Sequence, residues 1–297
     1  MSNLGPVDVH DHQAASPVLP TPTPASRFDT RRVYTALIGI PIVYGIIRYL
    51  PPWGVTVLAV LSGAIALLEL TRMSFGDRRN TALTGLALGL TALLIVRPHW
   101  TLPIDALLLP GLAFALLAML WSSNVVASRF HDAAIALFGP LYIGLTLSTL
   151  VSTRALPAGE WLIIFIALVT WASDIGAYYA GTLWGRHPLA PSISPKKSIE
   201  GVAGGLALAL AVAFVAQLWL VPQLTILHAL VLGLLMTATG LVGDLCESAM
   251  KRAVGVKDSG GILPGHGGML DRVDSLLFTA PTFYYYVTVV CGFSPIP

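Results

Sequence analysis

The chain has 297 residues, of which 55% are hydrophobic and only 11% are charged, and its mean hydropathy is +0.77. Soluble domains carry about 25% charged residues, because their surfaces face water. The composition therefore excludes a soluble globular enzyme, a disordered protein and a nucleic-acid binder with a basic face. It predicts a helical integral membrane protein, and the net charge of +2 indicates no polyanionic partner.

The first 32 residues differ from the rest of the chain. They contain five prolines (Pro6, Pro17, Pro20, Pro22 and Pro24) and no apolar run. This composition predicts a disordered cytoplasmic tail over residues 1–32. It lacks the charged and apolar regions of a cleaved signal peptide.

Nine apolar stretches follow, at residues 33–50, 55–71, 81–96, 102–120, 133–152, 161–182, 202–221, 224–243 and 275–292. Several contain about 20 residues, and a helix of that length crosses a hydrocarbon core of about 30 Å. Pro103 and Pro110 interrupt the fourth stretch, and the eighth helix is expected to continue toward residue 254. The prediction is an all-α fold with about nine transmembrane helices, those of residues 33–160 preceding a catalytic region at 161–297.

The positive charges predict the orientation of these helices. With a cytoplasmic N-terminus and nine spans, only Arg48, Arg97 and Arg154 of the 17 Lys and Arg residues lie outside, which leaves 14 inside. Cytoplasmic loops of membrane proteins are enriched in Lys and Arg. The sequence therefore predicts a cytoplasmic N-terminus and a periplasmic C-terminus.

The two longest polar connections, 183–201 and 244–274, both fall inside in this topology. The second contains five acidic residues, and a sixth acid, Asp174, lies near the inner end of the sixth stretch. Ionisable groups at membrane depth are costly and therefore mark functional sites. In a helix over 244–252, one face carries the side chains of Asp244, Glu247, Ser248, Lys251 and Arg252. A simpler interpretation of Glu247 and Lys251 is a helix-stabilising ion pair.

A glycine-rich loop follows this helix, first after Lys257 and Asp258 and again around His266, Gly267 and Gly268. Glycines leave backbone N–H groups free to approach a phosphate, although an ordinary flexible loop has the same composition. Asp271 and Asp274 then begin the last stretch. They either complement the helix dipole or bind Mg²⁺, which prefers carboxylate oxygens.

Two adjacent lysines, Lys196 and Lys197, precede the seventh stretch. They either set the topology or bind phosphate as point charges. Acids, bases and glycines on one membrane face together favour metal-assisted phosphoryl or nucleotidyl transfer.

One segment has a family signature, with this order: Ser248-x-x-Lys251-Arg252-x-x-x-x-Lys257-Asp258-x-x-x-x-Leu263-Pro264-x-His266-Gly267-Gly268-x-x-Asp271-Arg272-x-Asp274. It resembles the signature of the CDP-diacylglycerol synthases, or phosphatidate cytidylyltransferases. Two further stretches resemble the family: Asp174-Ile175-Gly176-Ala177-Tyr178 with Gly181, and Ile193-Ser194-Pro195-Lys196-Lys197-Ser198-x-Glu200-Gly201. The family more often has Thr in place of Ser198, which also supplies a hydroxyl. The likeness covers about residues 170–280.

The resemblance implies that CTP and phosphatidic acid react to give CDP-diacylglycerol and pyrophosphate, with one or two Mg²⁺ ions. Asp244 and Asp271 are the preferred metal ligands, with Asp258 and Asp274 as second choices. Lys251, Arg252, Lys257 and Arg272 are expected to neutralise phosphate charge. The remaining candidates for substrate contact are Lys196, Lys197, Ser248, His266, Gly267, Gly268 and Asp174.

The resemblance also implies a homodimer. The short tail and compact size favour a bacterial inner membrane, and the distribution of Lys and Arg predicts an active site that faces the cytoplasm. Two other functions fit the sequence less well. A CDP-alcohol phosphotransferase needs a different spacing of acids from that around Asp271. A cation or proton transporter would place its charges at mid-membrane on broken helices, whereas here all but Asp174 cluster at one face.

Overall fold

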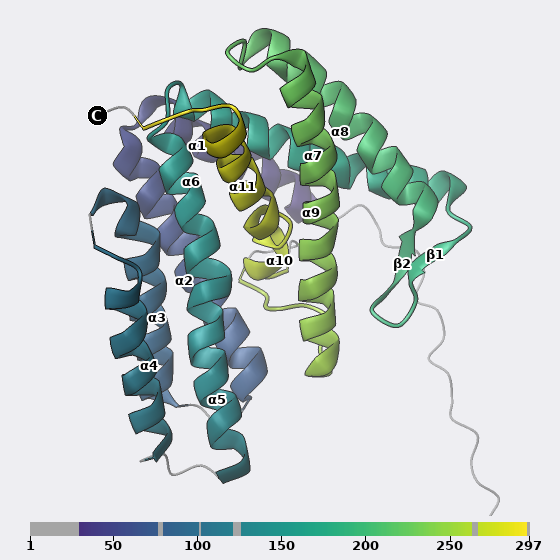
Figure 1. The fold of residues 1–297 in the computed structure, drawn as a ribbon. Helices are drawn as coiled ribbons and strands as arrows, with labels where there is room; N and C mark the ends of the chain where they lie inside the picture. Colours follow the sequence, from purple (N-terminus) through teal and green to yellow (C-terminus); the bar gives the residue numbers. More distant parts are fainter. Residues whose placement is uncertain (1–29, 77–79, 101, 121–125, 263–266, 296–297) are drawn as a thin grey trace, which may run out of the picture.

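The computed structural model describes residues 30–76, 80–100, 102–120, 126–262 and 267–295. Most of the tail predicted for residues 1–32 lies outside the described residues, as does His266. The chain is almost entirely helical, as the composition predicts, and its two halves pack side by side (Figure 1).

The N-terminal half is a bundle of helices. It comprises α1 (Thr30–Tyr49), α2 (Pro52–Phe75), α3 (Thr81–Val96), the 3-10 turn η1 (Arg97–His99), α4 (Asp105–Leu120), α5 (Val126–Gly139), the π-helical turn η2 (Pro140–Leu145) and α6 (Thr146–Arg154). Pro110 lies inside α4, so the proline that interrupts the apolar stretch does not end the helix. α5, η2 and α6 form one apolar rod over Ser128–Arg154. Pro140 has no N–H to donate, and the rod widens into the π-turn at this residue.

The C-terminal half places the polar segments. It comprises α7 (Gly159–Trp184), the strands β1 (Pro188–Ala190) and β2 (Ser194–Ser198), α8 (Ile199–Trp219), α9 (Ile226–Ala253), α10 (Leu270–Val273), α11 (Leu276–Tyr285) and the π-turn η3 (Tyr286–Val290). α10 lies beside α2 in the structure, so the segment before α11 joins the two halves (Figure 1).

A small hairpin is an exception to the predicted all-α fold. β1 and β2 pair antiparallel, with Pro188 opposite Ser198 and Ala190 opposite Ser194. The hairpin projects from the ends of α7 and α8 (Figure 1). It carries Lys196 and Lys197, which lie in the polar connection 183–201 of the predicted topology.

Six helices in the described part of the chain are long and apolar enough to cross a membrane: Pro52–Phe75, Thr81–His99, Ser128–Arg154, Gly159–Trp184, Ile199–Trp219 and Ile226–Ala253. The shorter apolar helices Leu37–Tyr49 and Asp105–Leu120, together with α11, occupy the other three predicted stretches. The chain is therefore an integral membrane protein, and nine spans with a cytoplasmic N-terminus remain a prediction.

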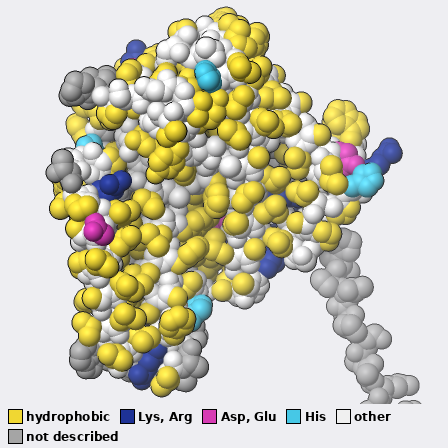
Figure 2. Space-filling model, in the orientation of Figure 1, with side chains coloured by type: hydrophobic (Ala, Val, Ile, Leu, Met, Phe, Trp, Pro, Cys, Tyr) yellow, Lys and Arg dark blue, Asp and Glu magenta, His cyan; other side chains and the backbone are white. Residues whose placement is uncertain are grey.

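Apolar side chains, drawn in yellow, cover much of the face of the molecule that Figure 2 shows. Trp219 on α8 and Val289 near the C-terminus are about four-fifths exposed, at 82% and 78%. Large apolar groups of this kind are stable where the surrounding solvent is lipid. The surface thus agrees with the span assignment.

Small residues allow α7 and α8 to pack closely. A Cβ atom on Gly204 of α8 would lie 2.1 Å from the Cβ of Ala180 on α7, and one on Gly205 would lie 2.7 Å from the backbone oxygen of Ser173. Contacts this short leave room only for hydrogen, and small residues bring membrane helices together in this way. This pairing fixes the base of the hairpin.

Gly204→Ala should therefore destabilise the protein by about 1–3 kcal/mol through overpacking. Gly89→Ala on α3 is the matched control, because a Cβ there meets nothing within 4 Å. Alanine favours helix over glycine, so the control should be neutral or stabilising by about 0.5–1 kcal/mol. Thermal unfolding of both variants in detergent measures the difference, and equal melting temperatures would contradict the tight α7–α8 contact.

Candidate functional site

The C-terminal end of α9 presents the acidic and basic residues of the signature. The helix continues to Ala253, as predicted, and Gly255 follows with a φ of +75°, which glycine adopts without strain. Glu247 and Lys251 are buried, one helical turn apart. The middle of the predicted face of α9 therefore points toward the rest of the protein, whereas Arg252 at its end is exposed.

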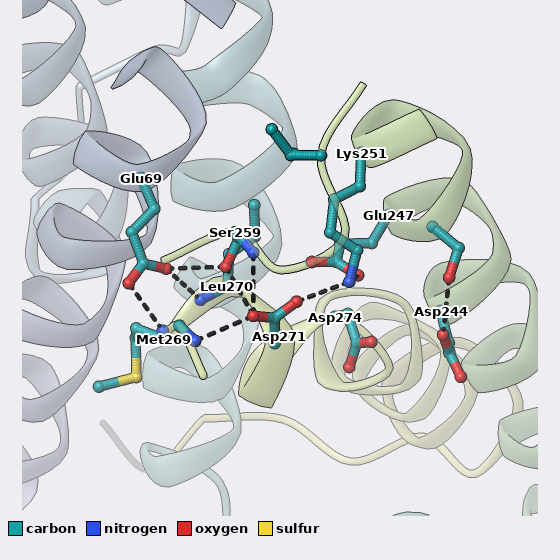
Figure 3. Close-up of polar contacts among 12 residues, drawn as sticks. Glu69, Asp244, Glu247, Lys251, Ser259, Met269, Leu270, Asp271 and Asp274 are labelled. Carbon is teal, nitrogen blue, oxygen red and sulfur yellow. Dashed lines mark hydrogen bonds and ion pairs between the residues drawn. The ribbon is translucent and has the colours of Figure 1, made fainter. Parts of the chain in front are cut away.

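Three carboxylates converge beside this helix. One oxygen each from Asp244, Glu247 and Asp274 lies within 4.8 Å of the others (Figure 3). Glu247 is buried, and its Oε2 forms an ion pair with Lys251 Nζ at 2.5 Å. Carboxylates held this close repel one another unless a cation lies among them. Three carboxylate oxygens suit a hard cation such as Mg²⁺.

A glycine makes this convergence geometrically feasible. Gly243 is buried on α9, and a Cβ on it would lie 2.6 Å from the backbone oxygen of Asp274. Any larger residue would push the start of α11 away from α9. The position of Asp274 beside Asp244 thus depends on the absence of a side chain at residue 243.

The environment of Asp274 disfavours its negative charge. Burial raises the pKa of Asp274, and repulsion from Asp244 raises it further, to about 7, although the backbone N–H of Ser275 donates to Oδ1 at 2.6 Å. A bound cation would reverse this preference by attracting the carboxylate. The pKa of Asp274 therefore agrees with a cation-binding cluster.

Lysine side chains neutralise the edges of the acidic cluster. Lys197 Nζ on β2 lies 2.5 Å from Asp244 Oδ2, so the hairpin closes one wall of the site. Asp174 is on α7, which packs against both β2 and α9. The structure thus brings together the three separate polar stretches that the sequence singled out.

Asp271 faces a different set of partners from Asp274. Its Oδ1 accepts a hydrogen bond from Lys251 Nζ at 2.6 Å, and its Oδ2 accepts from the backbone N–H of Ser259 and of Gly268 at 3.1 and 2.9 Å. Burial alone would raise the pKa of Asp271, but the hydrogen bond from Lys251 and the other donors outweigh it and lower the pKa to about 2. The structure therefore places Asp271 where it orients Lys251 and the glycine-rich loop. Glu247, rather than Asp271, lies with Asp244 and Asp274.

The other predicted site residues surround this core. Ser248 Oγ donates to Asp244 Oδ1 at 3.4 Å, and Arg252 donates to the backbone oxygens of Ile193 and Val256. Gly268 is buried, and Gly267 has a φ of +77° that favours glycine. The remaining four predicted residues expose their side chains: Lys196, Lys257, Asp258 and Arg272.

Two residues at the site were not predicted. Glu69 of α2 is buried and accepts hydrogen bonds from the signature segment (Figure 3). Tyr142, in the π-turn η2, is buried with its hydroxyl unpartnered among the described residues, and its ring lies 6.3 Å from that of Phe278 on α11. A lone acid in the apolar stretch 55–71 was a signal for Glu69. Tyr142 had no comparable signal.

Comparison with known proteins assigns the family. Residues 30–290 match the model of the Cytidylyltransferase family. The chain is 37% identical over 243 residues to the phosphatidate cytidylyltransferase of Bacillus subtilis, covering 79% of this chain and 88% of that protein. It is 38% identical over 256 residues to the phosphatidate cytidylyltransferase of Staphylococcus haemolyticus, covering 84% and 95%.

A third relative is similar over a shorter region. The uncharacterized protein YnbB of Escherichia coli is 43% identical over 139 residues, which cover 47% of this chain and 46% of that protein. The family match extends over nearly all of the described residues, including both halves of the fold and the acidic cluster. The chain belongs to the cytidylyltransferase family.

Proposed function

We propose that the protein is a phosphatidate cytidylyltransferase, which converts CTP and phosphatidic acid to CDP-diacylglycerol and pyrophosphate. The observation that carries the proposal is the cluster of Asp244, Glu247 and Asp274 beside Lys197 and Lys251, within a family whose relatives have this name. Such a cluster can hold a cation and anionic phosphates at the same place.

The carboxylates of Asp244, Glu247 and Asp274 would hold Mg²⁺, and Asp271 would act beside them through Lys251. When bound, the cation supplies charge neutralisation for the phosphates. Glu247 replaces Asp271 and Asp258 in this ligand set, because Asp271 already accepts from Lys251 Nζ and from the backbone N–H groups of Ser259 and Gly268, and because Asp258 is exposed. A metal titration of the purified protein would measure whether one or two ions bind.

The basic residues divide into two groups. Lys197 and Lys251 are already paired with acids of the cluster, so they fix its geometry and limit its negative charge. The exposed side chains of Lys196, Lys257 and Arg272 are placed to attract the triphosphate and the lipid phosphate from the aqueous side. His266, Gly267 and Gly268 would line the phosphates with polar and backbone groups.

The reaction needs little proton transfer. An oxygen of the phosphatidate phosphate attacks the α-phosphorus of CTP, and the bond from that phosphorus to the bridging oxygen of the β-phosphate breaks. Pyrophosphate leaves with the electron pair. Because the attacking phosphate is already anionic near neutral pH, the residues contribute positioning and charge neutralisation rather than strong base catalysis.

A site at the membrane face meets both substrates. CTP is soluble, whereas phosphatidate is held in the leaflet, so we place the site on the cytoplasmic side of a bacterial inner membrane. The excess of Lys and Arg on the proposed inner side supports this orientation. We also propose a homodimer, for which cross-linking in native membranes is the direct test.

The first experiment is a product assay. The purified protein, given CTP labelled in its cytidine, phosphatidic acid in mixed micelles and Mg²⁺, should produce a labelled lipid, and EDTA should abolish it. Omission of phosphatidic acid is the control for labelled contaminants. Folded protein that yields no labelled lipid would contradict the proposed function and favour the alternative, a cation or proton transporter.

Asp274→Asn should lower the turnover rate by about 100-fold or more, since at nearly constant volume it removes a carboxylate that a bound cation would keep ionised. Glu160→Gln is the matched control. Glu160 lies in the first turn of α7, away from the acidic cluster, and pairs with Arg154 at 3.2 Å. Steady-state kinetics and gel filtration in detergent separate lost chemistry from lost folding. A turnover rate equal to that of the control would remove Asp274 from the site.

Asp271→Asn should lower the turnover rate by about 10–100-fold, the usual effect of losing a residue that orients a metal site. With a pKa of about 2, Asp271 is ionised throughout the assay range, so the substitution removes a full negative charge from the position next to Lys251 Nζ. Turnover at several Mg²⁺ concentrations measures the effect. Unchanged turnover in a folded variant would show that Lys251 needs only Glu247.

A further inference from the structure

Glu69 lies in an environment that would normally exclude a carboxylate. It is only 2% exposed, on the apolar helix α2, between the fully buried Leu67 and the nearly fully buried Leu70. Burying a carboxylate is costly unless hydrogen-bond donors compensate. The donors that satisfy Glu69 therefore indicate why an acid is present at this position.

Within the described residues, the hydrogen-bond donors to Glu69 come from the signature segment, residues 248–274 (Figure 3). Oε1 accepts from the backbone N–H of Met269 at 3.0 Å, and Oε2 accepts from that of Leu270 at 2.9 Å. Oε2 also lies 3.1 Å from the hydroxyl of Ser259. Glu69 thus connects Ser259, before the glycines of the segment, to Met269 and Leu270, which follow them.

The hydroxyl of Ser259 connects Glu69 to the acidic cluster. It lies 3.1 Å from Glu69 Oε2 and 3.0 Å from Asp271 Oδ2. Asp271 in turn accepts from Lys251, whose Nζ lies 2.5 Å from Glu247 Oε2. A continuous series of polar contacts therefore runs from α2 to Glu247.

Two glycines of the signature fit closely against the Glu69 carboxylate. A Cβ on Gly260 would lie 2.5 Å from Oε1, and a Cβ on Gly268 would lie 2.5 Å from Oε2 and 2.1 Å from the hydroxyl of Ser259. Part of the glycine content of this segment is thus explained by Glu69 rather than by a phosphate. The carboxylate and the backbone fit each other closely at this point.

We propose that Glu69 is a positioning residue, which binds the signature segment to α2 and so holds Asp271 and Lys251 in place beside the acidic cluster. The inference rests on the proposed cytidylyltransferase function. Glu69 acts through Ser259 and the backbone of α10 and does not touch the substrates.

Glu69→Gln tests this role with almost no change of volume. The amide offers one acceptor oxygen in place of two, and its NH₂ group opposes the donors of the segment. The turnover rate should fall by about 10–100-fold, and a larger Mg²⁺ concentration should be needed for half-maximal activity, while the KM for CTP changes less. Glu160→Gln carries the same chemical change away from the site and should leave all three parameters unaltered.

A readout without substrates separates positioning from general stability. Binding of Mn²⁺ to the purified protein, followed by electron paramagnetic resonance, should weaken by about tenfold in Glu69→Gln and stay unchanged in Glu160→Gln. A double-mutant cycle with Ser259→Ala adds a second test, because two residues in one polar series should show non-additive losses in turnover. A residue with only a structural role would lower the folded fraction but leave the turnover of the folded molecules and their Mn²⁺ affinity unchanged.

The outcomes distinguish the two proposals. Wild-type protein that binds Mn²⁺ but makes no labelled lipid contradicts the function, and the Mn²⁺ affinities then decide the role of Glu69. Active wild-type protein, together with a Glu69→Gln variant of normal turnover and normal Mn²⁺ affinity, overturns the positioning role alone. Additive losses in the cycle would also overturn it, since Ser259 would then not connect Glu69 to Asp271.

Discussion

One ammonium group, Lys251 Nζ, holds the site together, because it lies within 2.6 Å of both a Glu247 and an Asp271 oxygen. Removing a single charge from water costs several kcal/mol, and the cost is recovered only where opposite charges and hydrogen bonds surround the group. With Lys251 in place, Glu247 can remain buried while Asp244 and Asp274 approach it. The remaining negative charge of the acidic cluster is what a cation and the basic residues around it would neutralise.

The backbone of the C-terminal half provides this arrangement by close helix packing. Gly243 lets α9 approach the backbone of Asp274, and Gly204 lets α8 approach α7. The second contact determines where the hairpin begins, and the hairpin brings Lys197 to Asp244. Small residues that carry no charge themselves thus determine which charges meet, as expected where helices associate by packing rather than by the hydrophobic effect.

Periodicity was enough to predict the helical parts of the site, but it could not predict the contacts between distant segments. Spacing alone placed Glu247 and Lys251 on one face of a helix, and the structure agrees. The contacts of Asp271 with Ser259 and Gly268 could not be foreseen, because they depend on the fold of the glycine-rich loop. The hydrogen-bond partners of Glu69 are separated from it by 190 to 201 positions in the sequence, and no local sequence pattern predicts such a contact. The hairpin carrying Lys197 was missed because its strands are short and lack alternating polarity.

The contact between Glu69 and the signature segment resolves a conflict within that segment. Glycines such as Gly260 and Gly268 permit close approach of the backbone, but glycine loses more conformational freedom on ordering than any other residue. A loop rich in glycine would therefore not hold Asp271 in one place by itself. A buried acceptor on a rigid helix supplies the missing constraint, because its hydrogen bonds are strong in a medium that offers the backbone N–H groups no water. The N-terminal half, whose sequence carries no catalytic signature, thereby becomes part of the site that the C-terminal half forms.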